Sequence, residues 1–202
     1  MRIASLPWYD LEEIRPSTDR LWRRLAVALR ERGVEGVPDS LERWIPYEDQ
    51  WRSPRLLFSQ ACGYDVVLPF RDHLKVVAAP IYAAPGCLGC EHQSFVVVRE
   101  DSGFERIEDL RGRRLAINTP TSHSGTNVIR WLVAALGASK PFFGGVSLSG
   151  SHSNSIDMVR EESADVASVD CVSYELLSRY RRHALRNIRI LQATPACPHL
   201  HL

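Results

Sequence analysis

The sequence lacks an excess of charge of either sign. Its 25 Lys and Arg residues nearly balance 24 Asp and Glu residues, which leaves a formal net charge of +1. Proteins that bind nucleic acid normally carry a basic excess on one face. The even balance therefore argues against a nucleic-acid-binding protein.

Long apolar runs are also missing. None approaches the ~18 residues needed to span a bilayer, although 45% of the 202 residues are hydrophobic. Residues 1–6 read as a strand, with no basic stretch followed by a long apolar one, so they do not resemble an export signal. We therefore expect a globular chain of one or two domains that does not insert into a membrane and is cytoplasmic as written.

Cysteine is scarce, and the five present are an odd number, whereas a secreted disulfide framework more often has an even one. Cys87 and Cys90, followed by His92, are the one metal-like or redox-like cluster. A single C-x-x-C motif is a weak metal signal, and this one does not open a helix as a thioredoxin-type motif would. We expect free thiols in a turn and predict no metal and no cofactor.

Short apolar strands alternate with amphipathic helices along the chain. Strands are expected at 3–6, 56–59, 75–79, 94–99, 115–117, 146–148, 165–169 and 188–191, with a turn at Gly63 and Tyr64. Helices are expected at 18–32, with Leu21, Trp22, Leu25, Ala26 and Leu29 facing inward, from 124 to Gly137, and near 153–162 and 175–180. This rhythm predicts an α/β protein with mostly parallel sheets. Residues 80–89, rich in Pro, Gly and Ala, are the best linker candidate.

Three polar loops follow strands in the second half, at the carboxyl ends where open α/β sheets bind ligands. They are residues 119–125, residues 149–153, and the loop that begins at Asp170. In the first loop, Ser122, His123, Ser124 and Gly125 open a helix, whose N–H groups favour an anion. The alternative for these residues is ordinary helix capping.

An acid in an anion site is tolerated when the anion itself carries a proton. Asp170 could accept a hydrogen bond from a P–OH group, which hydrogen phosphate and phosphonates have and sulfate lacks near pH 7. The alternative for Asp170 is a helix N-cap, and the alternative for His152 is a surface-loop histidine.

Two segments carry a family resemblance: LRGRRLAINTPTSHSG, and then FFGGVSLSGSHSNSIDMVREESADVASVDCVSYELL. Together they resemble the phosphate/phosphite/phosphonate-binding components of bacterial ABC importers, and the similarity covers most of residues 1–198. The resemblance implies the two-lobed type II periplasmic-binding-protein fold. Lobe one would be residues 1–80 with the tail 192–202, and lobe two residues 85–190, with an oxyanion held in the cleft between them.

The resemblance also implies roles for single residues. Ser122 and Ser124, with the amides of their helix, would cradle the phosphoryl oxygens, and His123 stands where a threonine is usual. His152 and Asp170 match the turn histidine and the strand-end aspartate of the family.

Tyrosines of the first lobe close over the ligand in that family. Tyr64 sits at the matching place, and Tyr9 and Tyr82 are looser candidates. The alternative for all three is a core or rim aromatic.

The implied partners are a small oxyanion and an ABC permease, and the implied location is the periplasm, whereas no export signal is visible. The chain also ends at Leu202, where the closing helices of this fold would be expected to follow. Two alternatives stay open. Cytoplasmic relatives of the fold catalyse steps in cofactor biosynthesis, with His123, His152 and Asp170 as acid and base, although no G-x-S-x-G nucleophile elbow is present. The other is a ligand-sensing domain.

Overall fold

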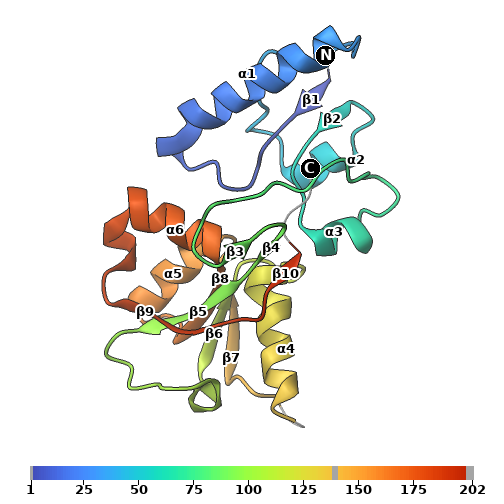
Figure 1. Ribbon diagram of the computed structural model, residues 1–202. Helices are drawn as coiled ribbons and strands as arrows, with labels where there is room; N and C mark the ends of the chain where they lie inside the picture. The colour runs from blue at the N-terminus through green and yellow to red at the C-terminus, as the bar shows by residue number, and fades with distance from the viewer. Residues whose placement is uncertain (1, 138–140, 199–202) are drawn as a thin grey trace. The chain divides into compact units, whose positions relative to one another are not determined.

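The computed structural model describes residues 2–137 and 141–198 (Figure 1). They divide into two compact units, residues 2–80 and residues 81–198. Among the helices in these ranges, none has the length and apolarity needed to cross a bilayer.

The first unit has two paired strands and several helices. β1 (Ile3–Ala4) runs parallel to β2 (Leu56–Phe58). The helical segments are η1 (Glu12–Ile14), α1 (Arg15–Glu31), α2 (Tyr47–Arg52) and α3 (Gly63–Val67). The predictions of strands near residues 3–6 and 56–59 are confirmed.

Helix α1 begins three residues earlier than predicted, because Pro16 fits the first helical turn, where an N–H group has no intrahelical acceptor. Trp22 and Ala26 are buried, as predicted, in a hydrophobic cluster that includes residues of β1 and β2. Leu21 was expected to face inward, but it is 51% exposed because its position falls at the edge of the apolar stripe. Gly33, at φ +79°, ends the helix.

Two predictions for the first unit are wrong. Residues 75–79 form no strand, and Val76 and Val77 are 49% and 72% exposed. A short apolar run becomes a strand only where a neighbour supplies hydrogen bonds, and no described strand pairs with this one. The turn expected at Gly63 and Tyr64 is instead the first turn of α3.

The second unit is built on a five-stranded sheet in the order β7-β6-β8-β5-β9. Its strands are β5 (Ser94–Arg99), β6 (Arg114–Ile117), β7 (Gly145–Leu148), β8 (Val166–Asp170) and β9 (Ile188–Ala193). β6 is parallel to β7 and β8, but β5 is antiparallel to β8 and β9. The sheet is therefore mixed and not mostly parallel, because an apolar run such as β5 reports burial and not strand direction.

Helices cover both faces of this sheet. α4 (Val128–Ala135) lies on one side, and α5 (His152–Arg160) and α6 (Cys171–Tyr180) lie on the other (Figure 1). Two short 3-10 helices are η2 (Ile107–Leu110) and η4 (Arg182–Leu185). Ile129 of α4 and Ile156 of α5 are fully buried, so each helix contributes to the core by its apolar face.

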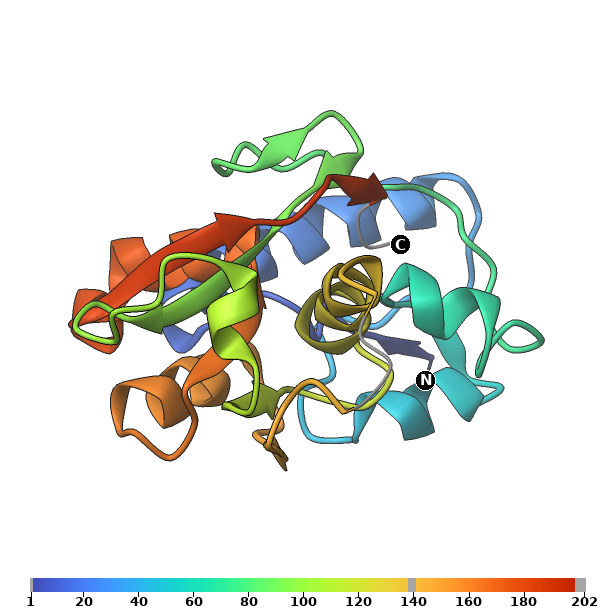
Figure 2. The same ribbon diagram turned by 90° about the horizontal axis from the view of Figure 1, so that it is seen from below.

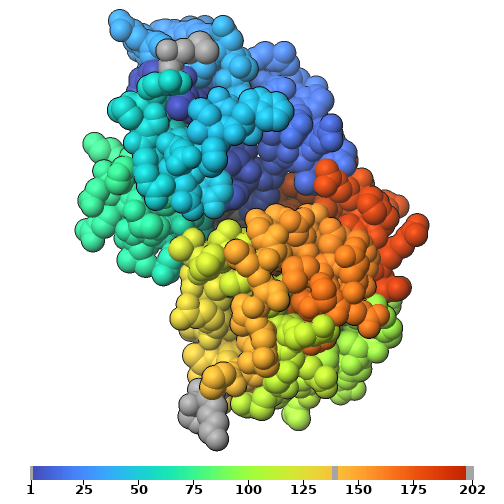
Figure 3. All heavy atoms as spheres, turned by 180° about the vertical axis from the view of Figure 1, so that it is seen from behind, coloured from blue at the N-terminus to red at the C-terminus, as the bar shows by residue number. Residues whose placement is uncertain are grey.

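One edge of the sheet is formed by β7. Two apolar side chains at alternate positions of this strand, Val146 and Leu148, are 59% and 65% exposed. The space-filling view shows the chain around residues 145–160, in yellow-orange to orange, at the surface of the second unit (Figure 3).

A three-stranded ribbon extends from the start of β5. It consists of β3 (Cys87–Leu88), β4 (Glu91–His92) and β10 (Cys197–Pro198), with β4 in the middle (Figure 2). The sequence assigns the tail 192–202 to lobe one, whereas residues 192–198 lie in the second unit. Two hydrogen bonds hold them there: the Thr194 N–H donates to the Ser94 carbonyl at 2.8 Å, and the Ser94 N–H donates to the Thr194 hydroxyl at 2.9 Å. Residues 199–202 are outside the described ranges.

Candidate functional site

The loop after β6 enters its helix through a π-helical turn, η3 (His123–Asn127). The Ser122 hydroxyl accepts a hydrogen bond from the Gly125 N–H at 3.1 Å, and the Asn127 N–H donates to the Ser122 carbonyl at 2.9 Å. Ser122 is therefore the N-cap, and it uses the Gly125 amide. The N–H groups of His123 and Ser124 have no acceptor inside the helix, because the first turn of a helix has no preceding carbonyl groups to receive them.

Gly125 lets this turn pass close to the end of β6. A Cβ atom at Gly125 would lie 1.9 Å from Asn118 Oδ1 and 3.1 Å from His152 Cε1. A Cβ there would clash with Asn118 of the same loop and press on the imidazole of His152 at the start of α5. Gly125 thus sets the position of the Ser124 side chain relative to His152.

The three predicted loops meet in one hydrogen-bonded chain. The Ser124 hydroxyl lies 2.9 Å from His152 Nε2, which lies 3.1 Å from Asp170 Oδ2. Asp170 Oδ1 accepts the Ser173 N–H at 2.9 Å, as the N-cap of α6. Ser168 adds a 2.6 Å bond from its hydroxyl to the Ser124 carbonyl. The juxtaposition follows from the sheet, because parallel strands β6, β7 and β8 end at the same edge.

Burial governs the charges of this chain of groups. The Asp170 side chain is 4% exposed, and burial alone would raise its pKa. The imidazole of His152 and the Ser173 N–H outweigh burial and lower the pKa of Asp170. Burial is the larger effect on His152 and lowers its pKa, against the raising effect of Asp170. At neutral pH we therefore assign an ionised Asp170 and a neutral His152.

The hydrogen positions follow from that assignment. A neutral His152 that carries its proton on Nε2 donates it toward the Asp170 carboxylate, the stronger acceptor. Ser124 then receives at most a share of that proton, and its own hydroxyl hydrogen remains available to a ligand.

His123 points to a different neighbour. Its Nε2 lies 3.0 Å from the Cys197 sulfur, which is 3.8 Å from Nδ1 of His92. Burial lowers the pKa of His123 and also that of His92, where it outweighs the nearby Asp170. Sequence reasoning did not connect Cys197 to this site, because the contact depends on the tail returning to β4.

The described parts of the chain contain no cluster of three or more His, Cys, Asp or Glu side chains arranged to hold a metal ion. Cys87 and Cys90 lie in the β3–β4 hairpin, where Cys90 is exposed. The hairpin confirms that the motif does not open a helix.

The three tyrosines lie elsewhere in the chain. Tyr9 and Tyr64 belong to the first unit, Tyr64 within α3 and Tyr9 in the loop after β1, where it takes a left-handed φ of 62°. Tyr82 lies just before the ribbon of the second unit. All three are half-buried, and their contact with a ligand stays a prediction.

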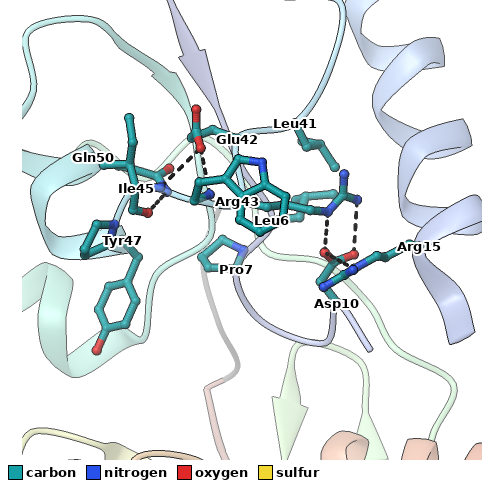
Figure 4. A pocket seen from close by; sticks show the side chains of 12 residues that line it. Leu6, Pro7, Asp10, Arg15, Leu41, Glu42, Arg43, Ile45, Tyr47 and Gln50 are labelled. Carbon is teal, nitrogen blue, oxygen red and sulfur yellow. Dashed lines mark hydrogen bonds and ion pairs between the residues drawn. The ribbon is translucent and has the colours of Figure 1, made fainter. Parts of the chain in front are cut away.

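The first unit also contains a pocket of about 340 Å³ beside the loop that carries Tyr9 (Figure 4). Asp10 lies in it and accepts a 2.6 Å hydrogen bond from Arg43 Nε, with Arg15 at 3.6 Å. Burial would raise the pKa of Asp10, but the bonds from Arg43 and Thr18 lower it. The pocket is lined by Leu6, Pro7, Asp10, Arg15, Leu41, Glu42, Arg43, Trp44, Ile45, Pro46, Tyr47 and Gln50.

Solved structures share the fold. PhnD1 from Prochlorococcus marinus, solved in complex with methylphosphonate, superimposes with a TM-score of 0.72 at 17% identity, covering 99% of this chain and 74% of that one. A binding protein component of an ABC phosphonate transporter from Pseudomonas aeruginosa gives 0.73 at 15% identity, covering 99% and 67%. The periplasmic aliphatic sulphonate-binding protein SsuA from Escherichia coli gives 0.55 at 14%, covering 96% and 56%. The chain therefore has the type II periplasmic-binding-protein fold.

Residues 58–202 match the family described as the periplasmic substrate-binding protein of phosphonate ABC transporters. Because that match covers most of the chain, the protein belongs to this family, as the sequence resemblance predicted. Members of the family are substrate-binding components of transporters rather than enzymes, so the catalytic alternative is not favoured.

Proposed function

We propose that the second unit binds the phosphoryl group of a phosphonate or hydrogen phosphate at the first turn of η3. The donors are the Ser124 hydroxyl and the N–H groups of His123 and Ser124. The His123 imidazole, whose Nε2 faces Cys197 at 3.0 Å, would offer the ligand its Nδ1 as a further polar contact. The observation that carries the proposal is the 2.9 Å contact between the Ser124 hydroxyl and His152 Nε2, which orients that hydroxyl for a ligand.

Ser122 and Gly125 support this site indirectly. The hydrogen bond between them holds the turn in the conformation that directs the N–H groups of His123 and Ser124 outward. Asp170 likewise supports the site by orienting His152, and its carboxylate would accept the hydrogen bond from a protonated ligand oxygen. A methylphosphonate-bound relative with the same fold supports the ligand class.

The proposal extends to the tyrosines and to a transport partner. Tyr64, and less directly Tyr9 and Tyr82, would cover the ligand once it is bound, and an ABC permease would receive it. Replacement of Tyr64 by Phe tests the hydroxyl alone: unchanged affinity for each anion would remove that hydroxyl from the mechanism.

The test is calorimetric titration with methylphosphonate, hydrogen phosphate and sulfate. Ser124→Ala should weaken phosphonate binding about tenfold or more, because a hydrogen bond to a charged ligand contributes about 1.5–3 kcal/mol. Ser147→Ala is the matched control, since Ser147 is exposed on β7 in the same unit. Equal affinity in the wild type and Ser124→Ala would refute the proposed site.

A further inference from the structure

Two cysteines that are distant in sequence meet beside the proposed site. The sulfur atoms of Cys87 and Cys171 lie 3.4 Å apart, across 84 positions of the chain. Cys87 is the first residue of β3, and Cys171 is the first residue of α6, directly after Asp170. All five cysteines lie in the described ranges and are reduced thiols in the structure.

The backbone around both thiols holds them in place. Cys171 is fully buried, and its N–H donates to the Gln93 carbonyl at 3.1 Å. Gly86 brings the chain against it: a Cβ atom there would lie 2.9 Å from Cys171 Cβ and 3.3 Å from its sulfur. Gly86 also has φ +93°, a conformation that other residues rarely adopt. Gly86 therefore allows the hairpin to approach the start of α6 closely, and this brings the next residue, Cys87, beside Cys171.

The C-x-x-C motif offers Cys87 a second partner, Cys90. That residue is exposed at the hairpin turn, whereas Cys171 is the thiol within hydrogen-bonding distance of Cys87. The contact therefore favours the long-range pair over the pair that the sequence motif suggests.

We propose that Cys87 and Cys171 are a redox-active pair that closes into a disulfide between the β3–β4 hairpin and the start of α6. A small-molecule disulfide is the oxidant. The Cys87 thiolate attacks one of its sulfurs and releases one thiol; the Cys171 thiolate then attacks the Cys87 sulfur and releases the second. The protein loses two hydrogens and two electrons in total, and the oxidant is reduced to two thiols.

Reactivity is unequal between the two sulfurs. Cys87 is half-buried, while burial and then the contact with Cys87 itself raise the pKa of Cys171 to about 12. Attack by the oxidant therefore starts at Cys87, and Cys171 resolves the mixed disulfide from within the protein, where its proximity compensates for its low thiolate fraction.

The experiment uses the full chain, first reduced and then exposed to oxidised glutathione. Non-reducing proteolysis and mass spectrometry identify the linked peptides, and thermal unfolding is recorded before and after oxidation. The variants are Cys87→Ser and Cys171→Ala, and Cys90→Ser is the matched control. Cys62 and Cys197 remain in every variant.

We expect a Cys87–Cys171 linked peptide in the wild type and Cys90→Ser and in neither of the other two variants. Oxidation should raise the unfolding midpoint of the wild type by about 5–15 °C, because a long loop is closed. A Cys87–Cys90 link, a stable glutathione adduct on Cys87, or no reaction would each overturn the proposal. None of these readouts requires an anion, so they stand apart from the proposed binding function.

Discussion

The Asp170 carboxylate joins His152 to the start of a second helix. One oxygen lies 3.1 Å from His152 Nε2 at the start of α5, and the other caps α6 through the Ser173 N–H at 2.9 Å. A single buried acid thus caps α6 and orients the imidazole of His152, which in turn contacts Ser124.

Two substitutions separate these roles of Asp170. Asp170→Asn keeps an oxygen for the Ser173 N–H, whereas Asp170→Ala removes the cap and leaves His152 without its acceptor. We expect the alanine variant to lose about 2–4 kcal/mol of unfolding free energy and the asparagine variant clearly less. Urea unfolding measures both, and equal losses would show that the cap contributes little.

Asp170 should also set the selectivity among anions. A carboxylate near the ligand repels a fully ionised group, and repulsion of this kind costs several kcal/mol unless the ligand donates a proton. The wild type should therefore prefer hydrogen phosphate over sulfate by about a hundredfold, and Asp170→Asn should narrow that preference. Competition calorimetry checks both. Equally tight sulfate binding by the wild type would limit Asp170 to its structural role.

Stability should fall as the pH drops below about 6.5, the ordinary histidine value. Burial lowers the pKa values of His152, His92 and His123, so the unfolded chain binds protons that the folded chain does not. The stabilisation is complete above the unfolded pKa and is lost as the pH falls toward the folded values. Each group contributes at most about 1.4 kcal/mol per pH unit in that window.

The histidine effect can be isolated by replacement of one group. His152→Gln should make the decline of unfolding free energy between about pH 6.5 and pH 5 shallower, as urea titrations at several pH values would show. A variant as acid-sensitive as the wild type would assign the effect to other groups.

Gly125 offers a test of close packing at the site. Gly125→Ala should cost about 1–3 kcal/mol, because its Cβ would fall 1.9 Å from Asn118 Oδ1. Asn118→Ala in the same chain should recover part of that loss, because it removes the nearest colliding atom. Thermal unfolding of the single and double variants measures the coupling. Independent, additive losses would contradict the proposed contact.

The sequence was sufficient to predict most of the second unit. The apolar run in β5 and the hydroxyl-rich entry to α4 both lie where the residues indicate, and the loops holding Ser124, His152 and Asp170 do converge. These features depend on local periodicity and on the rule that parallel strands end at one edge.

Other features depend on partners far away in the chain and were not predictable in this way. The direction of β5 is set by its pairing with β8 and β9, and the position of Cys197 by the pairing of β10 with β4. Val76 and Val77 read as a strand by composition, but a strand also needs a partner, which composition does not report.

The place of β8 in the sheet has a consequence for synthesis of the chain. β8 separates β6 from β5, yet it is made some 70 residues after β5. Until residues 166–170 leave the ribosome, Phe95, Val96, Val97 and Val98 have no strand to pair with, and β9 follows later still. A nascent chain in that interval presents an unpaired apolar strand, which is prone to aggregation. Delayed elongation before residue 166 should therefore increase the dependence of this protein on chaperones.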